Sequence, residues 1–181
     1  MLAAAAAAAL AACGAGTAEQ TPAGEVSAYG QGYALAYRQA DRMRNIDKLL
    51  IVKRESDALA EVTADVARVA ALIADRLHAH AAADASIALE TEFLPPIEAA
   101  ARERMGLGIA GELLLSFGCD FEERLLFTEA VAVMRLLAIA EEMQAEAPSD
   151  VELELWAGLA AELEPVFERI RGLLNTCGER R

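Results

Sequence analysis

Basic and aromatic residues are both scarce in this chain of 181 residues. Sixteen Lys and Arg stand against 29 Asp and Glu, which gives a formal net charge of −13, and Phe, Trp and Tyr make up only 5%. The charge argues against nucleic acid and against anionic lipid as partners, because both need a basic face. With so few aromatic residues, the core must be aliphatic.

Catalytic and metal-binding motifs are also missing. With two histidines in the chain, most acid–base mechanisms have no candidate residue. There is no nucleophile elbow, phosphate-cradling loop, zinc spacing or Glu-x-x-His pair. The nearest approach to a metal motif is Asp75 with His78, three apart on one helical face, although solvated residues on a surface helix explain this pair better. We therefore expect a protein that is not an enzyme and that holds no cofactor.

The first 27 residues differ from the rest of the chain. Residues 2–12 are all Ala or Leu, too few to span a bilayer but typical of a secretory signal peptide, here residues 1–12. The Leu-Ala-Ala-Cys run that ends at Cys13 resembles a bacterial lipobox, which implies lipidation of that cysteine. Residues 13–27 then form a flexible tether of small and polar residues.

The same segment also predicts where in the cell the protein is located. Gly14, not Asp, follows Cys13, and by resemblance to Gram-negative lipoproteins this favours the periplasmic side of the outer membrane. The segment departs from a usual signal in having no Lys or Arg before Arg38. A low-complexity alanine tail with a chance cysteine is the alternative interpretation.

Helical periodicity dominates the first half of the remaining chain. Residues 57–83 carry apolar side chains three or four apart, which predicts one helix with Ser56 as its N-cap. A similar stripe runs from Tyr33 through Leu50, so we expect an earlier helix that continues through Arg54. The break between the two is short, which predicts an antiparallel hairpin.

The second half predicts three more helical segments. Pro95 and Pro96 precede a segment at 97–116 that contains three glycines, so we expect a bend or break near Gly106. Asp120 is the expected cap of a helix over 121–147, and a last helix follows the turn at 148–150, with Pro165 inside it. Together these elements predict an all-α domain over residues 28–177, an up-down four-helix bundle with an interrupted helical crossover between its second and third long helices.

Two stretches in the second half resemble an uncharacterised family of exported, ferritin-like helical bundle proteins of bacteria. FGCDFEERLL (117–126) is similar to that family's junction into its third long helix, and LEPVFERIRGLL (163–174) is similar to a stretch of its last helix. Members of the family often carry histidines that face the bundle centre. The corresponding positions here are Thr128 or Val133 and Ile170, so the resemblance does not support a metal site at them.

The three cysteines fall into two groups, with Cys13 in the signal-like segment and the other two in the helical domain. If Cys13 carries lipid, Cys119 and Cys177 remain, in an oxidising compartment. They lie at equal distances along the chain from the turn at Pro148, so an antiparallel hairpin brings them to the same end of the bundle. We therefore expect a disulfide between them, with two separate thiols as the alternative.

These observations predict a lipid-anchored bundle of the cell envelope with a structural or interaction role. A ferritin-like metal-binding protein with carboxylate ligands, or a small-molecule carrier with a cavity between its helices, are the alternatives. The first helix is the most basic element, since it holds Arg38, Arg42, Arg44 and Lys48. This local excess of positive charge either pairs with acidic faces of neighbouring helices or forms a surface for an envelope partner.

Overall fold

Five helices make up nearly all of the chain that this computed structural model describes, which is residues 27–48, 56–90 and 94–179. The helices are α1 (Ala28–Met43), α2 (Asp57–Ala83), α3 (Pro96–Leu115), α4 (Cys119–Ala145) and α5 (Asp150–Glu179). No strand occurs within these described ranges. The predicted all-α helical bundle is therefore confirmed, whereas the signal peptide at 1–12 and the tether, apart from Ser27, lie outside the described residues.

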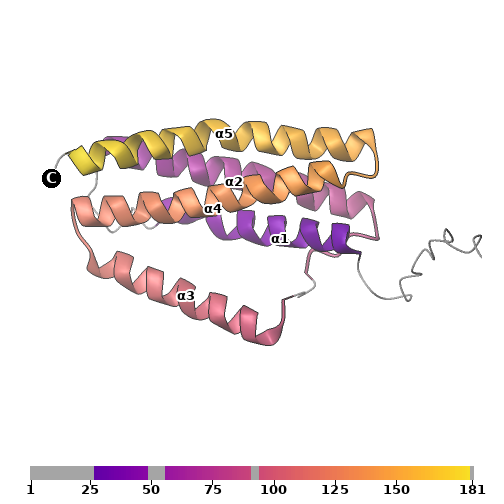
Figure 1. Ribbon diagram of the computed structural model, residues 1–181, viewed down its shortest axis with the longest axis horizontal. Coiled ribbons are helices and arrows are strands. Elements are labelled where there is room, and N and C mark those ends of the chain that lie inside the picture. The colour runs from indigo at the N-terminus through magenta and orange to yellow at the C-terminus, as the bar shows by residue number, and fades with distance from the viewer. Residues whose placement is uncertain (1–26, 49–55, 91–93, 180–181) are drawn as a thin grey trace, which may run out of the picture.

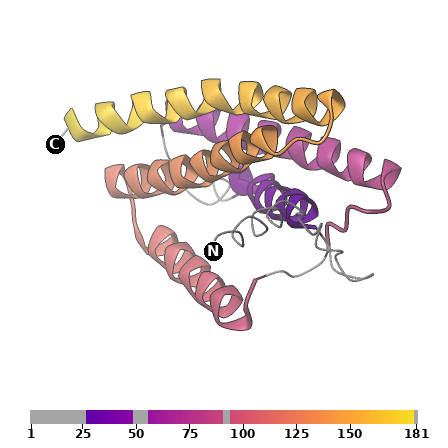
Figure 2. The same cartoon turned by 45° about the vertical axis from the view of Figure 1, so that its right-hand side comes forward.

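Four of the helices enclose a common core. α1 packs against α2 and α4, and α5 packs against the same two helices, so the four close into a bundle (Figure 1). The hairpins α1–α2 and α4–α5 are each antiparallel. Because α3 leads the chain back along the bundle, α2 and α4 run in the same direction (Figures 1 and 2).

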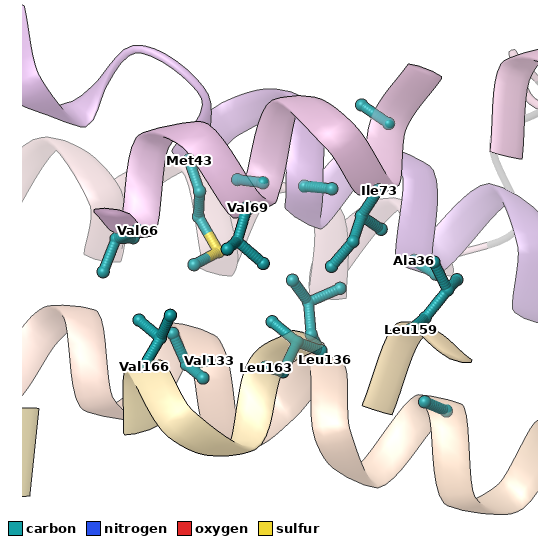
Figure 3. Close-up of a cluster of buried hydrophobic side chains, with 14 of the residues drawn as sticks. Ala36, Met43, Val66, Val69, Ile73, Val133, Leu136, Leu159, Leu163 and Val166 are labelled. Carbon is teal, nitrogen blue, oxygen red and sulfur yellow. The ribbon is translucent and has the colours of Figure 1, made fainter. Parts of the chain in front are cut away.

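The core is mostly aliphatic, as the composition predicts, although Tyr33, Phe121 and Trp156 are its largest fully buried side chains. Figure 3 shows side chains from α1, α2, α4 and α5 meeting between the helices; those labelled are Ala36, Met43, Val66, Val69, Ile73, Val133, Leu136, Leu159, Leu163 and Val166. Small residues let the helices approach closely. At Gly32 of α1 an added Cβ atom would collide with the sulfur of Met143 on α4, so the Met143 side chain lies directly against the backbone of α1 there.

α3 is the exception to this packing. Its apolar side chains are distributed around the helix, and only Leu113 is buried. Ile97, Met105, Leu107 and Leu115 are each more than half exposed. The main contact of α3 is with α4, and the helix stands apart from the other four in both ribbon views (Figures 1 and 2).

Two of the predicted helix starts have different outcomes. α2 has the predicted bounds, and its N-cap is Ser56, whose hydroxyl accepts a hydrogen bond from the Leu59 amide at 3.4 Å. The expected cap of α4 at Asp120 is wrong. The cap is Gly118, whose φ of 58° favours glycine, and Asp120 instead lies in the first turn, where a carboxylate is stabilised by the helix dipole.

Two other predictions differ from the structure, one about the end of the first helix and one about the crossover helix. The first helix ends at Met43 instead of continuing through Arg54, and a short 3₁₀ turn at 46–48 follows. Asn45 and Asp47 favour such turns, since their side chains compete for backbone hydrogen bonds. The expected break near Gly106 does not occur, since α3 is one continuous helix within the crossover. α5 contains Pro165, as predicted.

Candidate functional site

A polar cluster, largely shielded from solvent, joins three helices at one end of the bundle. Glu152 near the start of α5 accepts hydrogen bonds through Oε2 from the hydroxyls of Tyr33 and, at 3.2 Å, of Tyr29, both on α1. Its Oε1 lies 3.0 Å from Nε2 of His80, near the end of α2. The Trp156 indole donates to the Tyr29 hydroxyl at 3.1 Å. We call these five residues the Glu152 cluster.

Ring contacts fill the space around this carboxylate, whose side chain is 12% exposed. The Tyr33 ring stacks on His80 with centroids 5.3 Å apart and meets Trp156 edge-on at 4.9 Å. Tyr33 and Trp156 are fully buried, so their rings contribute to the packing of the bundle as well as to this cluster.

The Glu152 cluster has a structural role, because its contacts join side chains of different helices. Burial, and then the nearby Glu152 charge, raise the pKa of Tyr29 to about 12, and burial also raises the pKa of Tyr33. Both phenols therefore remain protonated donors at neutral pH. Because the carboxylate takes donors from α1 and contacts α2, the cluster fixes the relative positions of three helices.

A second carboxylate, fully buried, lies on α4 and has a different environment. Glu129 is 2% exposed, and neither of its oxygens has a hydrogen-bond partner within the described residues. Burial raises its pKa from 4.5 to about 7. The Thr63 hydroxyl lies beside it and lowers the pKa in part, although the two groups do not meet hydrogen-bond geometry. Glu129 is thus both neutral and charged in comparable amounts near neutral pH.

Glu129 lines a cavity of about 420 Å³ between α3 and the bundle, which we call the α3 groove. Its apolar lining includes Met43, Ile46, Val66, Met105, Ile109, Leu113 and Val131. Two neighbouring cavities, of about 820 and 760 Å³, each share part of this lining, so the hollow continues along α3 on both sides. The groove exists because α3 stands off from the face of α1 and α4.

Positive charge gathers on one side of the α3 groove. Arg42 of α1, Arg102 of α3 and Arg135 of α4 all line it, in a chain whose net charge is −13. Arg102 pairs with Glu98 at 2.6 Å. In the described part of the chain, neither Arg42 nor Arg135 has an acidic partner. Two guanidinium groups are therefore available to a ligand.

Asp75 and His78, the weak candidates for a metal site, contact other side chains in the structure. Asp75 lies 3.3 Å from the guanidinium of Arg44, and the ring of His78 lies against that of Tyr37. Across residues 27–48, 56–90 and 94–179, no three His, Cys, Asp or Glu side chains gather closely enough to hold a metal ion. None of the helices in these ranges is long and apolar enough to cross a membrane.

The cysteine predictions fall partly outside the described residues. Cys13 is among the undescribed N-terminal residues, so its lipidation stays a prediction. Cys119 is exposed at the first residue of α4, and Cys177 belongs to the last turn of α5, at the same end of the bundle (Figure 1). The side chain of Cys177 is not described, and the disulfide also stays a prediction.

Sequence reasoning missed both Glu152 and Glu129, although each left a signal. Tyr29 and Tyr33 are four apart, as are Glu152 and Trp156, so each pair shares one helical face. Glu129 stands four residues after Leu125 and four before Val133, within the apolar stripe of α4. A carboxylate inside such a stripe indicates a buried charge with a specific purpose.

Removal of the Glu152 carboxylate should loosen one end of the bundle. Glu152→Ala leaves the buried Tyr33 hydroxyl without its acceptor, so we expect the free energy of unfolding to fall by about 3 kcal/mol. The exposed Glu154, two residues along the same helix, gives the matched control, since Glu154→Ala should change it by less than about 0.5 kcal/mol. Urea unfolding followed by circular dichroism measures the free energy of unfolding of both variants. Equal unfolding midpoints for the two would contradict the structural role of the Glu152 cluster.

Glu129 should make stability depend on pH. A carboxyl whose pKa is raised in the folded state stabilises the fold at low pH, and this contribution is lost as pH rises from about 4.5 through 7. Glu129→Gln removes the ionisation. The variant should therefore gain roughly 2 to 3 kcal/mol over the native chain between pH 5 and pH 8, whereas the exposed Glu141→Gln should track the native chain. Parallel pH profiles for the native chain and the Glu129→Gln variant would refute the assignment.

Known proteins give no further guide to this site. A comparison of the chain with protein-family models, with curated proteins and with solved structures finds no match in any of the three. Its function is therefore inferred from its own residues.

Proposed function

We propose that the chain is a lipid-anchored protein of the bacterial cell envelope, on the periplasmic side of the outer membrane, that acts by binding and not by catalysis. The lipobox-like run before Cys13 supports the anchor, and residues 14–27 would tether the helical domain to the membrane surface. The absence of a catalytic motif in the sequence is consistent with a binding role.

The arrangement of the helices supports a ferritin-like topology for this domain. Ferritin-like folds join two antiparallel helix pairs by one long crossover, which makes the second and third helices of the bundle parallel. Here α2 and α4 run in the same direction, with α3 in the crossover between them (Figure 1). The family resemblance of residues 117–126 and 163–174 supports the same assignment.

The α3 groove is the observation on which the binding role depends. A volume of about 420 Å³ lies within the range of roughly 300–1,000 Å³ that is typical of small-molecule sites. It also has their composition, with mostly apolar walls and a smaller number of polar residues, here Gln39, Arg42, Arg102, Thr128, Glu129 and Arg135. The oxygens of Glu152, by contrast, are already engaged by protein side chains.

A ferritin-like metal-binding role is the second candidate function. Glu129 supports it, since a buried carboxylate without a hydrogen-bond partner among the described residues is a potential ligand for a cation. Against it, Glu129 belongs to no group of three or more ligating side chains within the described ranges. Stoichiometric iron, manganese or zinc in the purified protein would favour this candidate over an organic ligand.

The anchor is tested by exchanging one cysteine at a time. Cys13→Ser should abolish labelling by radioactive palmitate and release the full chain from the membrane fraction, because no acyl chain can then be attached. Cys119→Ser is the matched control and should keep both properties. Undiminished labelling of the Cys13→Ser protein would rule out the proposed anchor.

A further inference from the structure

We propose that the α3 groove binds a single-chain anionic amphiphile, such as a fatty-acid carboxylate, with its head at Arg42 and Arg135 and its chain along α3. The inference rests on the proposed binding function and names the class of ligand. It follows from three features of the groove, which are its charge, its walls and its buried polar group.

The charge of the groove is opposite to that of the whole chain. The overall charge of −13 predicts poor affinity for anionic lipid surfaces, yet three arginines line this cavity. Arg42 and Arg135 have no acidic partner within the described residues, and they come from different helices, α1 and α4. Two unpaired guanidinium groups facing one apolar cavity match a carboxylate or similar anion, which each can bind through paired N–H donors.

The walls of the groove match a hydrocarbon chain. Met105, Ile109 and Leu113 follow one another at intervals of four along α3, and Val131 faces the same cavity from α4. Met105 is 65% exposed and Ile109 39% exposed, so part of this apolar surface remains in contact with solvent. A ligand chain that covered them would remove this apolar surface from water, which favours binding.

Glu129 distinguishes this cavity from a mere gap between helices. A buried carboxyl that finds no hydrogen-bond partner in the described part of the chain costs free energy, which a core residue with only a packing role would not retain. Glu129 is one of the residues that line the cavity, so a ligand held there lies beside a carboxyl whose two oxygens are buried and unpaired within the described residues. In its neutral form it can donate a hydrogen bond to an oxygen of the ligand.

The test compares three ligands with the same twelve-carbon chain and different heads: laurate, dodecylamine and dodecyl maltoside. They compete with a neutral apolar dye for the full chain that carries Cys13→Ser, so that no detergent is needed. Laurate should displace the dye at concentrations at least about tenfold lower than the other two. Arg42→Gln with Arg135→Gln should remove this preference, whereas Arg68→Gln with Arg171→Gln, which changes the net charge equally outside the groove lining, should preserve it.

The contrary outcomes separate the two proposals. Equal displacement by all three ligands would overturn the anionic preference and leave the binding function intact. A chain that binds neither dye nor ligand would overturn both. Sedimentation that shows a dimer unaffected by laurate, and dissociated by Leu107→Glu on exposed α3, would assign the groove to a second copy of the chain instead. Circular dichroism of each variant confirms that a lost preference does not reflect unfolding.

Discussion

The mutual burial of four apolar stripes, one each on α1, α2, α4 and α5, is the constraint on which the rest of the structure depends. These stripes bury one another, and within the described residues the fifth helix, α3, adds only Leu113 to the core. α3 therefore completes the crossover without packing closely against the bundle. The α3 groove is the direct consequence, because a helix that must pass the bundle but cannot pack tightly against it leaves a hollow.

The carboxylates of Glu152 and Glu129 lie in contrasting environments within one bundle. Glu152 is surrounded by donors from α1 and by His80 of α2, and it contributes to a single arrangement of the helices. Glu129 has no such partners among the described residues and faces the groove. An unsatisfied buried group costs stability, and such costs concentrate at sites that bind ligands. A glutamate shielded from solvent thus contributes to stability at one position of this fold and costs stability at another.

The sequence predicted the elements better than it predicted the site. The stripe from Leu59 to Leu77 located α2 with its observed bounds, since apolar periodicity and a Ser cap agree there. Spacing overestimated the first helix, because it does not register the turn preference of Asn45 and Asp47. The groove was beyond sequence reasoning, since its arginines come together only when α1, α3 and α4 are placed in space.

Hydrogen exchange of the native chain, read by mass spectrometry, tests most directly whether α3 stands apart from the four-helix core. Amides of α3 should exchange by local opening well before those of α2, α4 and α5, because few buried contacts hold this helix in place. Equal protection of residues 96–115 and residues 121–143 would contradict the account, since it would require α3 to be an integral part of the core.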